Sequence, residues 1–186
     1  NLATWTGQPI PEQKPAPAVE KTPAPKPVEK TWKVGDYYNV GGKEGVVFWV
    51  DETGKHGKIV SMDQTELRWC TDDEYHKGVT GIATDRSNGM NNLRSIMKID
   101  EWRNKYPAFA WCADHGDGWY LPAIDELKKL LLNDEVHAKV NGTLEQKRVS
   151  VMYSMGDIDC YWSSTEEDEW WAWHVNMFAG DSYRND

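Results

Sequence analysis

The chain has few cysteines, few phenylalanines and no long apolar run. Its 186 residues include 3 Cys and 3 Phe. An odd cysteine count is unusual for a secreted disulfide framework, and at most one intrachain bridge can form. No apolar run approaches the roughly 18 residues that a membrane-spanning helix needs. We therefore expect no membrane span and no fold that depends on several disulfides.

Basic residues are also scarce. The chain has 21 Lys and Arg against 30 Asp and Glu, for a formal net charge of −9. No basic cluster of the kind that binds a phosphate backbone is present, so we expect no nucleic-acid partner. No secretory signal peptide is recognisable. We interpret the start at Asn1 as that of a mature or trimmed product, from which an export signal could have been removed.

Proline, in contrast, is concentrated near the N-terminus. Seven of the nine prolines lie within residues 9–27. A Pro/Ala/Lys/Glu stretch favours extended polyproline II and cannot bury enough surface to fold. We predict that residues 1–33 are a stalk or linker, a semi-rigid spacer of about 3 Å per residue. Residues 34–186 are predicted to form one globular domain, which carries the acidic charge.

Tryptophan is the residue type that most distinguishes the composition, with 11 Trp in the chain. Trp buries a large apolar area and carries an N–H that needs a partner. In one interpretation Trp replaces Leu and Phe in a loop-rich core. In the other, some Trp residues form a recognition surface, where Trp, Tyr and Arg dominate binding energy. We expect roughly two thirds of them to be core.

The pattern of short apolar runs predicts strands at both ends of the domain and helices between them. Aromatic and β-branched runs separated by Gly, Asn and Asp predict hairpins. Helical spacing predicts three helices, one capped by Asn91 or Asn92, one from Pro107 and one after Pro122. The third helix is predicted to have one apolar face, formed by Ile124, Leu127, Leu130 and Leu131. After Lys139 we expect strands again, with a turn at Gly180. The predicted strands are 37–40, 45–50, 57–62, 161–165 and 171–177.

This order of elements predicts an α+β domain. We expect a small twisted antiparallel sheet with two or three helices packed on one side. Such segregation places the strands from the two ends of the domain together and leaves the helices as a separate layer.

Three ordered motifs resemble a known family. They are Asp117–Leu127 (DGWYLPAIDEL), Tyr161–Thr165 (YWSST) and Trp173–Asn176 (WHVN). They resemble signatures of the C-terminal domain of bacterial collagen-like adhesins, a family common in gut bacteria and their phages. That family is related to C-type-lectin-like and formylglycine-generating-enzyme-like folds, and to the variable proteins of diversity-generating retroelements.

The resemblance spans roughly residues 35–186 and implies a C-type-lectin-like, ligand-binding domain. Family members continue with one more aromatic-rich strand, which is not found in this chain. We interpret this difference as a trimmed end or as a strand that another chain supplies. The resemblance also implies that the segment after YWSST folds back as a strand and loop on the exposed face.

Alternation within that segment puts Trp171 and Trp173 on one strand face and Trp170 and His174 on the other. One of these sets must be exposed, unless loops cover both faces. Exposed aromatic residues beside Asn, Asp and Arg suit stacking on sugars or contact with a protein. The predicted ligand-binding residues are Trp170, Trp171, Trp173, His174, Asn176, Asp181, Tyr183, Arg184 and Asn185.

Carboxylates cluster at four places in the sequence. Calcium binds six to eight oxygen ligands, so these clusters leave calcium open as a cofactor. Charge runs are more often solvated loops, and no cofactor is our principal expectation. The clusters are 72–74, 114 with 117, 157 with 159, and 166–169.

The cysteines allow three interpretations. Cys112 and His115 stand at i and i+3, and with Cys70 and His76 could ligate zinc. Cys70 and Cys112 each follow a Trp, which is typical of buried thiols or of a mutual disulfide bridge.

Recognition outside the cytoplasm is the function that these patterns favour. The sequence contains no GxSxG, P-loop or GxGxxG motif, and we do not expect an enzyme. We expect a domain that binds a glycan or protein receptor on a cell surface or phage particle. One alternative is an assembly or oligomerisation module, such as a trimer, of a fibre, pilus or virion. A second alternative is a metal-dependent enzyme.

Overall fold

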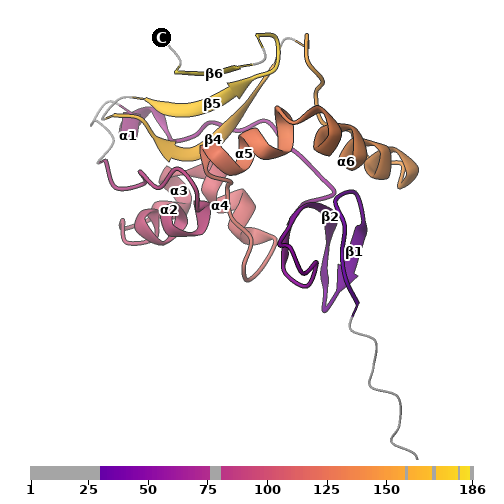
Figure 1. Ribbon diagram of the computed structural model, residues 1–186. Coiled ribbons are helices and arrows are strands. Elements are labelled where there is room, and N and C mark those ends of the chain that lie inside the picture. The colour runs from indigo at the N-terminus through magenta and orange to yellow at the C-terminus, as the bar shows by residue number, and fades with distance from the viewer. Residues whose placement is uncertain (1–29, 76–80, 158, 169–170, 180, 185–186) are drawn as a thin grey trace, which may run out of the picture.

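The structure is a computed structural model that describes residues 30–75, 81–157, 159–168, 171–179 and 181–184, the last of these by backbone alone. It is an α+β domain, as predicted (Figure 1). The Pro-rich stretch lies outside the described residues. The elements in chain order are β1 (Tyr37–Val40), β2 (Lys43–Val50), β3 (Gly57–Val60), α1 (Asp72–Tyr75), α2 (Gly89–Ile96), α3 (Trp102–Lys105), α4 (Pro107–Asp114), α5 (Ile124–Leu131), α6 (Asp134–Gln146), β4 (Cys160–Glu166), β5 (Ala172–Asn176) and β6 (Asp181–Arg184).

Two separate antiparallel sheets replace the single small sheet that the sequence suggested. β1, β2 and β3 pair in that order, with Tyr37 opposite Val46. β4, β5 and β6 form the other sheet, in which Trp162 lies opposite His174. The strands of each sheet are close neighbours in sequence, so each sheet forms from local hairpins. The helices between them keep the two sheets apart (Figure 1).

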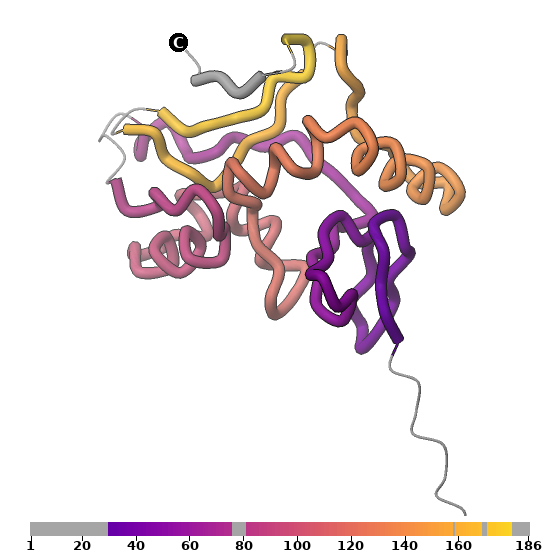
Figure 2. The backbone as a smooth tube through the Cα atoms, in the orientation of Figure 1, coloured from indigo at the N-terminus to yellow at the C-terminus, as the bar shows by residue number. Residues whose placement is uncertain are grey.

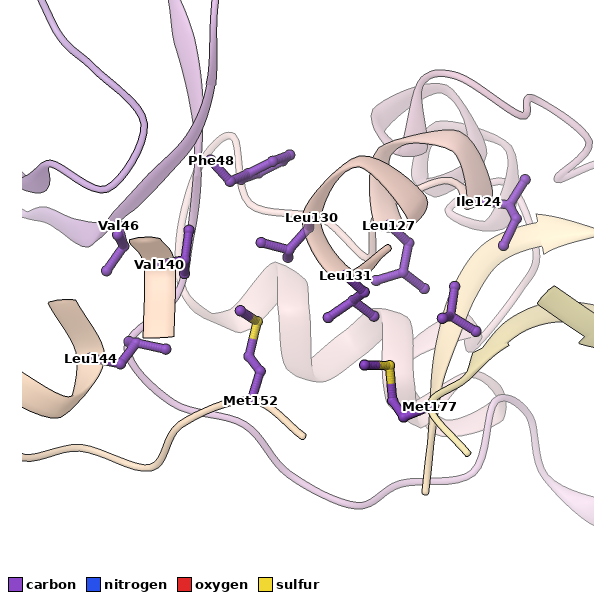
Figure 3. Packing of buried hydrophobic residues seen from close by; sticks show 11 residues of the cluster. Val46, Phe48, Ile124, Leu127, Leu130, Leu131, Val140, Leu144, Met152 and Met177 are labelled. Atoms are coloured by element: carbon purple, nitrogen blue, oxygen red, sulfur yellow. The ribbon is translucent and has the colours of Figure 1, made fainter. Parts of the chain in front are cut away.

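The main hydrophobic core joins both sheets through α5. Ile124, Leu127, Leu130 and Leu131 are all buried, which confirms the apolar face that was predicted for this helix. Figure 3 shows these side chains between residues of β2 and α6 on one side and Met177 on the other. The other buried members are Val46, Phe48, Val140, Leu144, Met152 and Val175.

A second core lies under the shorter helices. Trp69 packs edge-to-face against Tyr106 and Phe109, with ring centroids 5.6 and 5.2 Å away. Leu93 and Ile96 of α2 complete it. Edge-to-face geometry is favourable for aromatic rings beyond the area that they bury. Of the tryptophans in the described segments, Trp69 alone is fully buried, so the expectation that two thirds are core was wrong.

The helical region is larger than expected, with six helices in the described part of the chain instead of two or three. The return to β structure was expected too early, at Lys139, because α6 continues to Gln146, whereas the strands predicted at 161–165 and 171–177 are found as β4 and β5. Asn141 and Gly142 are poor helix formers, but packing overrides propensity here. Val140 and Leu144 are buried in the main core, and Thr143 Oγ1 donates to Gly35 O at 2.6 Å.

Helix starts were predicted more closely than helix number. Pro107 is the first residue of α4, as expected. The cap of α2 is Asn88, whose side chain accepts from Met90 N, and neither Asn91 nor Asn92 has that role. Near the end of the chain, β6 follows directly on the expected turn and adds a strand that we did not predict.

The chain path brings distant segments together. Figure 2 shows the segment between β3 and α1 running from the first sheet to the second. Gln64 in this segment bonds to Val151 O at 2.9 Å and accepts from the Tyr161 hydroxyl at 2.7 Å. Within the described ranges, no helix has the length and apolar character needed to cross a membrane.

Candidate functional site

The motif DGWYLPAIDEL surrounds one buried carboxylate. Glu126 is 3% exposed and accepts from the backbone N–H groups of Ala123 and Gly89, each at 2.9 Å. The Tyr120 hydroxyl donates to it at 2.9 Å, and the Lys58 ammonium contacts it. A buried charge is tolerated only when it is paired and hydrogen-bonded. Glu126 therefore ties α5 to α2 and to β3.

The close approach at Gly89 explains why this position has no side chain. A Cβ there would lie 2.3 Å from Leu121 O and 2.9 Å from Ala123 N. Such a contact is impossible without movement of the backbone. The start of α2 and the start of α5 are therefore packed backbone against backbone.

Ser163, Ser164 and Thr165 of the motif YWSST are also buried, whereas its Tyr161 and Trp162 are half-buried. Ser163 Oγ donates to Trp173 O at 2.7 Å, and Ser163 O accepts from the Trp69 indole at 2.8 Å. Ser164 Oγ accepts from Asn92 Nδ2 at 2.9 Å. The motif thus joins β5, α2 and the second core to β4.

Thr165 completes this network. Its hydroxyl accepts from Ile124 N and donates to Asp85 O, both at 3.0 Å. We call the set Gly89, Asn92, Glu126 and Ser163–Thr165 the motif lock. Because the side chains of the lock are buried and hydrogen-bonded, Glu126 and Ser163–Thr165, the residues that two of the motifs contribute to it, stabilise the fold.

The predicted ligand-binding residues are only partly brought together. Trp171 and Trp173 are half-buried; Trp171 lies 6.4 Å from the Tyr75 ring, and the Arg86 guanidinium lies 4.9 Å over the Trp173 ring. Backbone alone is described for Asp181, Tyr183 and Arg184, which belong to β6. Trp170 and Asn185 lie outside the described residues.

Two of the predicted residues have structural roles. The Asn176 side chain accepts from the backbone N–H groups of Phe178 and Ala179, at 2.9 and 3.2 Å, and holds the turn after β5. His174 is 2% exposed, with its ring 5.5 Å from Trp162. Burial lowers the pKa of His174 and favours the neutral ring. The expectation that His174 contacts a ligand on an exposed face was therefore wrong.

The carboxylate clusters do not converge. Across the described ranges, no three His, Cys, Asp or Glu side chains are placed as metal ligands. Asp72 pairs with Arg68, and Asp114 pairs with Arg103. Calcium stays a prediction of the sequence alone.

The three cysteines are free thiols, and each is partly buried. Burial raises the pKa of Cys70 to about 11 and that of Cys112 to about 12, and it also raises the pKa of Cys160. Of the interpretations drawn from the sequence, the structure shows the free-thiol one. His76, the fourth member of the suggested zinc set, lies outside the described residues.

A cleft of about 1240 Å³ lies between the first sheet, the end of α4 and the segment that precedes β4. We call it the aromatic cleft. Its rings come from the start of the domain, from α4 and the residues that follow it, and from the residues around the start of β4. The aromatic side chains that line it are Trp32, Tyr38, Trp111, Trp119, Tyr153, Tyr161 and Trp162, with Phe48 and Tyr120 deeper in it.

One wall of the cleft is built around His115. The ring lies 4.5 Å from the Trp111 ring and 5.6 Å from the Trp119 ring, measured between centroids. Its Nδ1 is 3.0 Å from Trp111 O, and its Nε2 is 2.9 Å from Asp63 Oδ1. Both partners are acceptors, so the arrangement is fully bonded only when both ring nitrogens carry a proton.

These contacts also set the charge of His115. Burial alone would lower its pKa, but the bonds to Asp63 and to the Trp111 carbonyl, with the nearby charge of Asp114, outweigh burial and leave the pKa raised. The charged imidazolium joins the loop after β3 to the end of α4 across the cleft wall.

The opposite wall carries Tyr153 and Tyr161, whose ring centroids are 5.8 Å apart. Burial raises the pKa of Tyr161 to about 12, so its hydroxyl stays protonated and donates to Gln64. Asp159 accepts from Cys160 N at 2.7 Å and raises the pKa of Tyr153 by hydrogen bonding to its hydroxyl.

Sequence reasoning missed this cleft as a site. Its aromatic residues are dispersed from Trp32 to Trp162, so no local run marks them. The one available signal was the large number of Trp residues, which exceeds what the cores can bury.

Comparison of the chain with family models, with curated proteins and with solved structures found no match.

Proposed function

We propose that this protein is a recognition module that binds a glycan or a protein receptor outside the cytoplasm, on a cell surface or phage particle, and does not catalyse a reaction. The aromatic cleft is the observation that carries this proposal. It presents several rings to solvent in one concave site, and exposed Trp and Tyr residues supply binding energy through desolvated area.

The size of the cleft favours an extended ligand. Pockets for small molecules usually measure about 300–1,000 Å³. A volume of about 1240 Å³ exceeds this range and suits a chain of several units. Trp171, Trp173 and residues 181–184 form a second contact region that we predict from sequence.

We also propose that the domain is a C-type-lectin-like head of the kind found at the C-terminus of collagen-like adhesins. The support is that the three motifs contact one another: Thr165 of YWSST accepts from Ile124 N of DGWYLPAIDEL, and Ser163 donates to Trp173 O of WHVN.

The proposal is tested by binding of the full chain to a glycan array and to a panel of cell-surface proteins, each with calcium and with chelator. We expect specific binding that Trp119→Ala abolishes. Trp49→Ala is the matched control, because Trp49 is 38% exposed on β2 and does not line the cleft. Binding that both variants retain would remove the cleft from the proposal. Absence of any binding would contradict the recognition function.

A role in assembly is the second candidate. Phe178 is 66% exposed and Met155 is 52% exposed. Gly156 N donates to Met177 O at 2.8 Å, which brings the turns that carry these two side chains together. Exposed apolar patches commonly mark subunit interfaces. Size-exclusion chromatography with light scattering, on the wild-type chain and Phe178→Ser, tests for a trimer or other oligomer.

A further inference from the structure

The aromatic cleft contains hydrogen-bond donors that the protein does not use. The Trp69 indole donates to Ser163 O at 2.8 Å. The indoles of Trp111, Trp119 and Trp162, in contrast, have no acceptor in the described part of the chain. None of these three N–H groups is fully buried, because buried side-chain atoms without a partner are found only at Glu166, Glu167 and His174 within the same described ranges.

The cleft also presents carboxylates. Asp63, Glu66 and Asp159 line it, and the Asp63 side chain is 61% exposed. Basic groups line it too: Lys43, Lys55, His56 and Lys58 come from the first sheet and its turn, and His115 comes from the end of α4. Lys58 is paired with Glu126, and the His115 ring is paired with Asp63. Glu66 and Asp159 have no cationic partner among the described residues, so a complementary ligand would offer apolar units for the rings, acceptors for the indoles and a cation for these two carboxylates.

A proline-rich peptide with lysines meets all three requirements. Proline rings pack against aromatic side chains in grooves that recognise polyproline II. The polyproline II backbone forms no internal hydrogen bonds, so its carbonyl groups are available as acceptors. Lysine side chains supply the cations. A neutral glycan offers hydroxyls to the indoles but no cation to the carboxylates.

Residues 9–27 of this chain have that composition. They contain seven prolines and the three lysines Lys14, Lys21 and Lys26, against Glu12 and Glu20, for a formal charge of +1. The chain as a whole carries −9, so segment and domain are opposite in charge. The segment is joined to the domain at the cleft itself, because Trp32 and Tyr38 line the cleft.

This segment can reach the cleft of a second copy more readily than the cleft of its own chain. The backbone N–H of Trp32 donates to Gly54 O at 2.7 Å and fixes this residue on the domain. Only residues 28–31 lie between this anchor and Pro27, and an extended Pro-rich segment is too stiff to reverse direction over so short a stretch. At about 3.1 Å per residue, residues 9–27 would span roughly 59 Å, enough to reach a neighbouring molecule.

We propose that the aromatic cleft binds a lysine-bearing, proline-rich peptide segment, and that its ligand is residues 9–27 of a second copy of this chain. This inference rests on the proposed function, since it names the partner for the same cleft. It predicts head-to-tail association that involves no new folding of the domain.

The test uses a fluorescein-labelled peptide of residues 9–27 titrated with the full chain, with anisotropy as the readout. We expect saturable binding that Trp119→Ala weakens about tenfold or more, as for an aromatic hot spot. Trp119→Phe keeps a ring but removes the N–H and is expected to weaken binding about threefold to tenfold. Trp49→Ala leaves binding unchanged. A peptide with its three lysines replaced by alanine binds more weakly and with less dependence on salt.

Sedimentation velocity of the full chain provides the second readout. We expect concentration-dependent association that excess peptide dissociates. A chain that binds the peptide but stays monomeric well above the measured Kd would overturn the second-copy assignment. Peptide binding that is absent, or equal in Trp119→Ala and Trp49→Ala, would overturn the inference. If a glycan then binds and Trp119→Ala abolishes that binding, the proposed function stands without this inference; if nothing binds, both fail.

Discussion

Polar groups in the motif lock are almost all paired, whereas several in the aromatic cleft are not. In the lock, Thr165 and Glu126 bond to neighbours from other elements and are shielded from water. In the cleft, the indoles of Trp111, Trp119 and Trp162 have no acceptor among the described residues. Satisfied buried groups specify a fold, while unsatisfied accessible ones are available to a ligand. The difference separates the residues that build this domain from those that serve its proposed function.

We expect the largest loss of stability when the carboxylate at the centre of the motif lock is removed. Glu126→Ala leaves the Ala123 and Gly89 N–H groups, the Tyr120 hydroxyl and the Lys58 ammonium without their acceptor. We expect a loss of about 3–5 kcal/mol in the free energy of unfolding, as when one partner of a buried ion pair is deleted. Urea denaturation measures it.

Glu145→Ala is the control for this change, because Glu145 is an exposed residue near the end of α6. An effect of Glu126→Ala no greater than that of Glu145→Ala would show that the lock does not stabilise the fold.

A smaller effect is expected at Thr165. Thr165→Val keeps the shape of the side chain but leaves Ile124 N without its acceptor and removes one of the two donors to Asp85 O, the other being Asn92 Nδ2. We expect a loss of about 1–3 kcal/mol, measured by the same denaturation. Thr165→Ser retains the hydroxyl and should recover most of that loss. Equal stability of the Val and Ser variants would argue against the hydrogen bonds as the cause.

Replacing a Trp in the aromatic cleft and a Trp in a core should change the free energy of unfolding by different amounts. Trp119→Ala in the cleft is expected to change the free energy of unfolding by less than about 1 kcal/mol, as for most surface positions. Trp69→Ala in the second core serves as the reference and should cost about 3–5 kcal/mol, because Trp69 is 5% exposed. Thermal denaturation compares the two, and similar losses would place Trp119 in the core.

We expect the smallest change in stability from a change in pH. The pKa of His115 is raised in the folded state, so its contribution to stability is complete below the unfolded pKa and is lost as pH rises through the folded pKa. His174 has a lowered pKa, so it acts in the opposite direction and disfavours folding as pH falls.

The two histidines can be separated by substitution. We expect the difference in Tm between wild type and His115→Gln to be larger at pH 6 than at pH 8.5. A difference that does not change over this range would contradict a role for the charged imidazolium.

The same comparison explains what could be read from the sequence. Pro107 and the apolar face of α5 were predictable, because each is encoded within a few residues. α6 was not, because Val140 and Leu144 are held helical by a core built from β2 and α5. The division of the strands into two sheets also depends on tertiary packing, which no local pattern encodes.

The site was harder to predict than the fold. The alternation of residues predicted a ligand-binding face on the strand of Trp173 and His174, but His174 is buried. The aromatic cleft assembles residues as distant as Trp32 and Trp162, and only the folded chain brings them together. Residue type indicated that a recognition surface was plausible, and tertiary structure was needed to locate it.

The three thiols have a practical consequence. In the described part of the chain, Cys70, Cys112 and Cys160 are free thiols, so packing and hydrogen bonds hold this part together without a disulfide. Thiolate is the reactive form of cysteine, and burial keeps Cys70, Cys112 and Cys160 protonated at neutral pH. The folded chain should therefore resist alkylation and oxidation, and a cysteine introduced on the surface would be the preferred position for a label.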